Sequence, residues 1–154
     1  MEIIRALFSN HWLVCAFLGW LFAQLIKGVL DAVRNRKFDI SRFFGAGGMP
    51  SSHSSLVASL TMIIALTKGL DCAEFALALV FAFVVIYDSC GVRYESGQQA
   101  KLINQIIASM KSADQEAGEQ KLKEFLGHTK LQTTAGTLLG ILIATLYYFI
   151  VKPY

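Results

Sequence analysis

The sequence predicts an all-α membrane protein, a polytopic helical bundle with about four transmembrane helices plus an amphipathic helix in a long loop. Hydrophobic residues make up 55% of the 154 residues and charged residues only 16%, too few charges to coat a soluble domain of this size. The apolar residues form four long runs separated by polar segments. Residues 1–154 are therefore expected to form a single membrane domain.

The predicted spans, in order, are about 12–30, 55–70, 72–87 and 133–151. Each is slightly shorter than the roughly 20 residues that a spanning helix usually needs. Lys27, Lys68 and Lys152 lie at or near the ends of spans, where a long aliphatic stem can cross hydrocarbon while the ammonium reaches the headgroups. The first run has no small-residue cleavage site, so we expect an uncleaved span. A soluble bundle of buried helices is the alternative interpretation.

Four spans place the polar loops 31–54 and 88–132 on one side of the membrane and both termini on the other. Most lysines and arginines fall on the loop-rich side, against only Arg5, Lys68 and Lys152 opposite. The positive-inside rule then predicts an integral membrane protein whose loop-rich side is cytoplasmic.

The second loop has a helical pattern of its own. Apolar residues recur in it at helical spacing, namely Leu102, Ile103, Ile106, Ile107 and Met110. A helix with one apolar face can lie in the plane of the interface or cover the membrane face of the protein. A shorter helix is expected around 119–126.

Composition also argues against several classes of function. The net charge is only +3, without a basic, aromatic-interleaved face, so no nucleic-acid partner is predicted. The three cysteines are widely spaced and form neither a disulfide framework nor a CxxC motif. There is no HExxH or acidic cluster with ligand spacing, so the sequence predicts no metal site and no cofactor.

A glycine-rich loop over 45–50 runs directly into an apolar helical segment. Glycines such as Gly48 let backbone amides approach a ligand, and the free amides at a helix start favour phosphate. Ser51 and Ser52 suit that start and add hydroxyl donors, while His53 in the first turn could protonate a leaving oxygen. An ordinary helix cap with a solvated histidine is the alternative.

A second cluster opens the fourth span, on the same side as His53. His128 and Gln132 are four residues apart, so they share a helix face, and the amide oxygen could accept the proton of one ring nitrogen. The other nitrogen would then be a nucleophile. Gly136 and Gly140 extend the same stripe and would let a neighbouring helix approach closely.

Three further residues are candidates for phosphate chemistry. Arg93, at the exit of the third span, is of the type best suited to fork onto two phosphate oxygens, although it could equally be a positive charge at the membrane edge. Asp88 precedes it. Lys27 lies within the first span, where an ionisable residue is costly unless it snorkels to the interface or meets a partner, so it is a candidate functional residue.

These clusters together resemble the divergent branch of the type 2 phosphatidic acid phosphatase superfamily, which is related to the vanadium-dependent haloperoxidases. The superfamily's first motif, a lysine with six residues to Arg-Pro, matches Lys27 and Arg34, with Asn35 at the proline position. Its second, Pro-Ser-Gly-His, matches residues 50–53 with serine in place of glycine.

The third motif is recognisable at His128, but Leu122 stands at its arginine position and Gln132 at that of its acid. The resemblance implies that His128 is the nucleophile, His53 the general acid and Gln132 the residue that orients His128. The phosphate-binding residues it implies are Lys27, Arg34, Gly48, Ser51, Ser52 and Arg93. Asp88, Lys121 and Lys123 are possible supporting residues, the lysines or Arg93 replacing the missing arginine.

The resemblance therefore implies a metal-independent phosphatase, a phosphoric ester hydrolase that cleaves a lipid phosphate or diphosphate through a phosphohistidine intermediate. Vanadate is expected only as a phosphate mimic. The expected partners are membrane lipid and a phosphorylated lipid substrate, with a possible homodimer because four helices are few to enclose a headgroup. The alternative is a catalytically impaired relative that binds phosphorylated lipid or a membrane partner.

Overall fold

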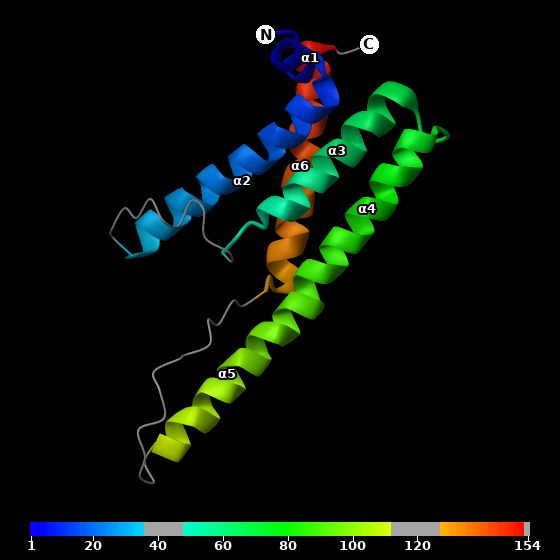
Figure 1. Ribbon diagram of the computed structural model, residues 1–154. Helices are drawn as coiled ribbons and strands as arrows, with labels where there is room; N and C mark the ends of the chain where they lie inside the picture. The colour runs from blue at the N-terminus through cyan, green and yellow to red at the C-terminus, as the bar shows by residue number, and fades with distance from the viewer. Residues whose placement is uncertain (36–47, 112–126, 153–154) are drawn as a thin grey trace.

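The computed structural model describes residues 1–35, 48–111 and 127–152. Within these ranges the chain is all-α, as predicted, and has no strand. Its helices are α1 (Glu2–Ser9), α2 (His11–Asn35), α3 (Ser52–Lys68), α4 (Ala73–Cys90), α5 (Val92–Lys111) and α6 (Lys130–Val151). Figure 1 shows α1 and the last turn of α6 together at one end of the bundle, while α5 projects from the other end.

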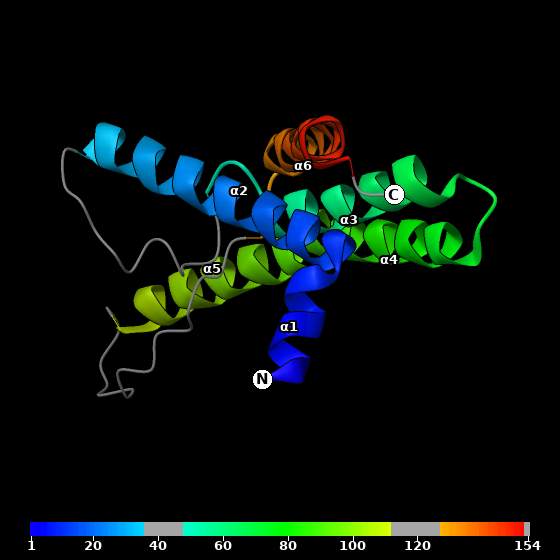
Figure 2. The ribbon, with the colours of Figure 1, turned by 90° about the horizontal axis from the view of Figure 1, so that it is seen from above.

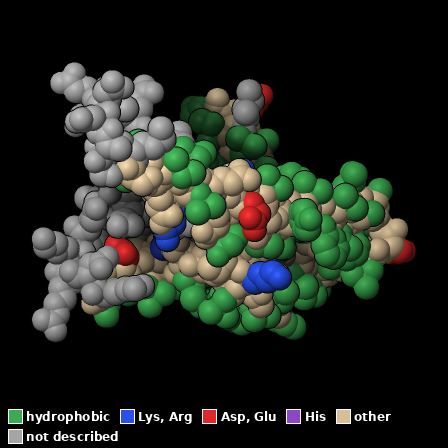
Figure 3. All heavy atoms as spheres, turned by 90° about the horizontal axis from the view of Figure 1, so that it is seen from below, with side chains coloured by type: hydrophobic (Ala, Val, Ile, Leu, Met, Phe, Trp, Pro, Cys, Tyr) green, Lys and Arg blue, Asp and Glu red, His purple; other side chains and the backbone are tan. Residues whose placement is uncertain are grey.

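In the part of the chain that the structure describes, three stretches are long and apolar enough to cross a membrane: His11–Val33, Ala73–Ser109 and Lys130–Val151. Hydrophobic side chains cover much of the described surface in Figure 3, as expected of helices that face lipid. The protein is therefore an integral membrane protein. Helix α3 is not among the three, because its 17 residues fall short of the roughly 20 that a span usually needs, so the predicted count of four spans is not confirmed.

The segment from residue 88 onward differs from the polar loop that the sequence predicted. Helix α4 continues to Cys90, and α5 follows directly from Val92, with only Gly91 between them. Figure 1 shows the two as one long rod. The first half of α5 is polar and carries no apolar periodicity, so only its second half was predicted as a helix. The helix expected around 119–126 lies outside the described residues.

Helix α3 is the centre of the bundle and packs through serines onto glycines of its neighbours. The Ser55 hydroxyl donates to the Gly19 carbonyl of α2 at 2.8 Å, and the Ser59 hydroxyl donates to the Gly140 carbonyl of α6 at 3.0 Å. A Cβ at Gly140 would collide with the Ser55 carbonyl oxygen. Small residues therefore let the backbones touch, the usual means by which helices associate where lipid removes the hydrophobic driving force.

Aromatic side chains hold together the end of the bundle at which α1 and the last turn of α6 lie. The Trp12 indole donates to the Thr67 hydroxyl at 2.9 Å, and His11 Nδ1 lies 2.9 Å from the Tyr147 hydroxyl. Tryptophan and tyrosine with a polar tip are typical of the membrane–water interface. Figure 2 shows the short helix α1 turned across the axis of α2 at this end.

Replacing Gly140 with alanine is expected to lower the stability of the bundle by about 1–3 kcal/mol, because the added methyl overpacks the α3–α6 contact. The thermal unfolding midpoint in detergent measures this loss. Leu142→Val on the exposed face of α6 is the control and should change stability by less than about 0.5 kcal/mol. Equal midpoints for the two variants would contradict the close packing.

Candidate functional site

The candidate site lies at the end of the bundle where α2 and α4 end and α3 and α6 begin. Two backbone hydrogen bonds join these elements. Ser51 N–H donates to the Gln132 carbonyl at 3.1 Å, and His128 N–H donates to the Ser89 carbonyl at 3.0 Å. The start of α3, the turn before α6 and the end of α4 are thereby fixed to one another.

A capping box at the start of α6 determines how His128 is held. The Thr129 hydroxyl accepts from Gln132 N–H at 3.3 Å, and Gln132 Oε1 accepts from Thr129 N–H at 3.1 Å. The same oxygen lies 3.2 Å from His128 Nδ1. Because a backbone N–H can bond only the oxygen end of the amide, this orientation makes Nδ1 the protonated nitrogen. In the neutral ring Nε2 then carries the lone pair.

Lys27 is buried, with 7% of its surface exposed, and its stem lies against Gly48. A Cβ at Gly48 would stand 3.1 Å from Cγ and 3.2 Å from Cδ of Lys27. Gly48 also has φ +86, a left-handed conformation that glycine adopts without strain. Gly48 thus lies against the lysine side chain, and its backbone also contacts the His128 side chain.

Electrostatics connect the two histidines with the basic residues. Burial lowers the pKa of His128, and the charges of Lys27 and His53 lower it further, against the raising effect of the hydrogen bonds of the ring to Gln132 Oε1 and to the Gly48 backbone. Partial burial, then Arg93 and Lys27, lower the pKa of His53, although its side chain remains exposed. Both rings are therefore neutral at pH 7 in a positive surrounding, which favours the binding of an anion.

The two serines at the start of α3 are buried rather than open to solvent. The Ser51 hydroxyl accepts from Ser54 N–H at 3.4 Å and from the Ser54 hydroxyl at 3.0 Å, which is the geometry of a helix cap. Ser52 is 3% exposed. The backbone amides of this helix start thus remain the better phosphate donors there.

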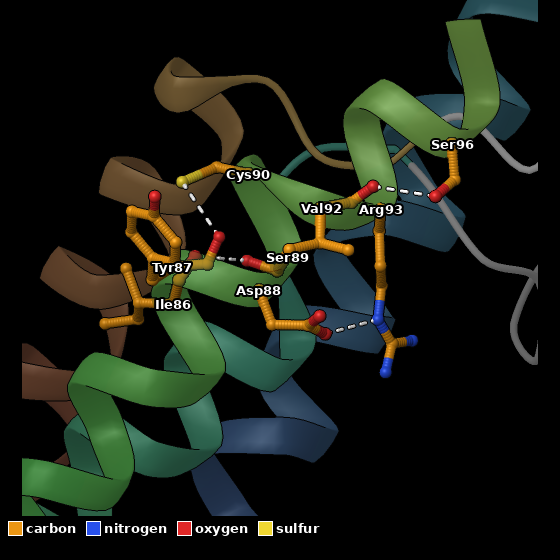
Figure 4. Close-up of polar contacts among 8 residues, drawn as sticks. All are labelled: Ile86, Tyr87, Asp88, Ser89, Cys90, Val92, Arg93 and Ser96. Atoms are coloured by element: carbon orange, nitrogen blue, oxygen red, sulfur yellow. Dashed lines mark hydrogen bonds and ion pairs between the residues drawn. The ribbon is translucent and has the colours of Figure 1, made fainter. Parts of the chain in front are cut away.

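Arg93 lies at the rim of the site, in the first turn of α5. Its Nε forms an ion pair with Asp88 Oδ2 at 2.6 Å across the break between α4 and α5 (Figure 4). The two side chains are 68% and 39% exposed, so the pair contributes little to stability. Arg93 therefore lies exposed at the rim, in an ion pair that costs little to break.

Some predicted residues lie beyond what the structure describes. Lys121 and Lys123 fall in the segment 112–126, and the Arg34 side chain is likewise outside the described atoms, although its backbone lies about two turns beyond Lys27 on α2. Among described residues, no group of three His, Cys, Asp or Glu could hold a metal.

Gln24 was not singled out from the sequence. It is 7% exposed, and its Oε1 has no hydrogen-bond partner among the described atoms. It stands one turn before Lys27 on α2, and a polar residue inside an apolar span was the available signal.

The fold and the site together define an integral membrane protein of α-helices with a basic histidine site at one end. Residues 8–143 match the family model described as the Divergent PAP2 family, and the chain belongs to this family, which confirms the resemblance. A relative from Bacillus subtilis (strain 168), "Uncharacterized membrane protein YuiD", is 37% identical over 155 residues, covering 93% of this chain and 98% of the relative. No solved structure matches the chain.

The lowered pKa of His128 predicts acid sensitivity. Below about pH 6.5 His128 binds a proton more readily in the unfolded chain than in the folded protein. The contribution of the neutral ring to the free energy of unfolding is therefore fully present above that pH and is lost as the pH falls. We expect the unfolding midpoint of the wild type to drop more steeply from about pH 7.5 to about pH 5 than that of His128→Gln, which has no such proton to bind. Parallel slopes would contradict the buried neutral histidine.

Proposed function

We propose that the protein is a membrane-embedded phosphatase that hydrolyses a lipid phosphate or diphosphate through a phosphohistidine on His128. The observation that carries the proposal is the buried His128 ring, whose Nδ1 faces Gln132 Oε1 at 3.2 Å while Lys27 and His53 act on it electrostatically. A nucleophile oriented by a hydrogen bond and placed beside positive charge is the arrangement that phosphoryl transfer needs.

In the first step, the lone pair of His128 Nε2 attacks phosphorus. The bond from phosphorus to the lipid oxygen breaks, and protonated His53 gives its proton to that oxygen, so that the lipid alcohol leaves. Lys27, Arg93 and the amides at the start of α3 offset the charge on the equatorial oxygens. Substrate binding supports this step, because the negative charge of the phosphate raises the pKa of His53 toward the protonated form.

In the second step, neutral His53 takes a proton from water as its oxygen attacks phosphorus. The bond between phosphorus and Nε2 breaks, phosphate leaves, and both histidines return to their starting states. Gln132 supports the imidazolium less than a carboxylate would, since a neutral amide offsets less positive charge. We therefore expect a slower enzyme than one with an acid at this position.

The proposal includes a topology. With α3 crossing beside α2, α4 and α6, the site and α5 lie on one side and the two termini on the other. The excess of lysine and arginine on the site side supports a cytoplasmic location. A short α3 is compatible with crossing, because it is shielded by its neighbours and local thinning of the bilayer tolerates a mismatch.

Gln132 also supports a second candidate, a catalytically impaired relative that binds phosphorylated lipid. Its amide satisfies the capping box and His128 without any charge, so the anion pocket would remain while the chemistry is lost. This candidate predicts binding without turnover.

The test is phosphate release from phosphatidic acid, a polyprenyl phosphate and a polyprenyl diphosphate in detergent with chelator present. His128→Ala should abolish turnover, and His53→Ala should lower kcat by about 10²–10⁴-fold because general acid catalysis is lost. His11→Ala, at the opposite end of the bundle, is the matched control and should retain activity. Full activity in both site variants would refute the mechanism.

A wild type that releases no phosphate from any of these lipids would separate the two candidates. Vanadate should then raise the unfolding midpoint of the wild type but not of His128→Ala, if the pocket has kept only its binding function. No shift in either protein would exclude both candidates.

The pH profile tests the roles of the histidines. His128 must be neutral and His53 protonated, and both pKa values are lowered, so kcat/KM should be highest below about pH 6.5. Arg93→Gln removes a charge that lowers the pKa of His53, so the alkaline limb should move to higher pH. Lys101→Gln, farther along α5, should leave the limb in place. An unmoved limb in Arg93→Gln would remove His53 from the general-acid role.

A further inference from the structure

An apolar groove of about 350 Å³ lies between α3, α4 and α6, a volume within the range of about 300–1,000 Å³ for ligand pockets. Its floor on α3 includes Ala58, Met62 and Ala65, and its walls include Phe83 on α4 and Ile141 on α6. Phe83 is 67% exposed and Ile141 38%, so the groove opens toward the lipid side of the bundle.

The groove presents no unsatisfied hydroxyl to an occupant. Thr61 and Thr137 are its polar residues, and both hydroxyls donate within their own helices, to the Val57 carbonyl at 2.8 Å and to the Thr133 carbonyl at 3.0 Å. An occupant with polar groups would therefore find no partners there, whereas a hydrocarbon chain needs none.

The groove lies on the same three helices as the candidate site, within about two helical turns of it. Helix α3 carries Ser52 at the site and Ala58 in the groove, and α6 carries Gln132 at the site and Thr137 in the groove. The Ser89 carbonyl, which binds His128 N–H, lies one turn beyond the groove residue Ile86 on α4. In Figure 1, α4 and α6 diverge from this end.

The dimensions fit an extended chain. The stretch of α4 from Phe75 to Ile86, which lines the groove, is about 16 Å long, so the groove is elongated along the helix. A charged pocket above an apolar groove also matches a phospholipid, with its anionic head and its chain.

We propose that one hydrocarbon chain of the phosphorylated lipid lies in this groove while its phosphate occupies the site at His128. The inference rests on the proposed function for the identity of the headgroup, and it assigns the substrate to long-chain lipids. Ala65→Phe fills the groove. Ala76→Phe, on the exposed face of α4 and outside the groove, is the matched control.

The experiment measures binding without turnover. The probes are phosphonate analogues of phosphatidic acid, in which a methylene replaces the leaving oxygen, with two palmitoyl or two hexanoyl chains, and native mass spectrometry counts the bound lipid. Wild type and Ala76→Phe should prefer the palmitoyl analogue by roughly tenfold or more, and Ala65→Phe should lose most of this preference. An unchanged preference in Ala65→Phe would overturn the proposal.

A second pair keeps the test decisive if Ala65→Phe does not fold. Leu79→Trp changes a groove residue that is 36% exposed, and Leu77→Trp changes one on the same helix that is 73% exposed. Only the first should lower the preference for the long chain, and equal effects of the two would overturn the proposal.

Hydrolysis of palmitoyl and hexanoyl phosphatidic acid is measured in parallel. If Ala65→Phe loses the chain preference and the wild type hydrolyses neither lipid, the groove is upheld and the phosphatase is refuted. Turnover that depends on His128 but shows the same chain preference in Ala65→Phe as in wild type would uphold the phosphatase and refute the groove.

Discussion

The close contact of α3 with α6 is the constraint on which the rest of the structure depends. Because Gly136 and Gly140 have no side chains, the Ser51 and Ser55 carbonyls of α3 reach the α6 backbone. That contact brings the start of α3 beside the start of α6, so that Ser51 N–H can donate to the Gln132 carbonyl. The histidine of each helix start is then held at the same end of the bundle. Larger side chains in place of Gly136 and Gly140 would push α3 away from α6. They would thereby separate His53 from His128 without changing either histidine.

Gln132 links this packing to the chemistry of the site. Its backbone carbonyl holds α3, its side-chain oxygen caps the Thr129 amide, and the same oxygen orients His128. The cap fixes the direction of the amide, and the amide fixes the tautomer of the ring. A local rule of helix initiation thereby determines which nitrogen carries the lone pair. One side-chain oxygen thus serves both the helix cap and the orientation of the His128 ring.

Much of this arrangement could be predicted from the sequence because it depends on local rules. The Ser51 cap and the pairing of His128 with Gln132 follow from residue types and spacings of three or four along a helix, and the close approach at Gly140 follows from a small residue inside a span. The start of α5 could not be predicted, since its first half has no apolar periodicity and Gly91 before it is a residue type that usually interrupts a helix. The contact between Lys27 and Gly48 joins segments far apart in the chain, so no spacing rule reports it.

Gln132 is neutral and stands where the third motif of the superfamily has an acid. This affects the electric field of the whole site. Every charged group that shifts the pKa of His53 or His128 is positive. A carboxylate at residue 132 would offset part of that charge and favour a protonated His128 in the empty site, where it could not attack. With an amide, the ring stays neutral and the surrounding charge is left for the ligand. In the proposed function the site thus gives up stabilisation of the imidazolium, and in exchange its positive field acts on an incoming anion, which both hydrolysis and simple binding of a phosphorylated lipid would require.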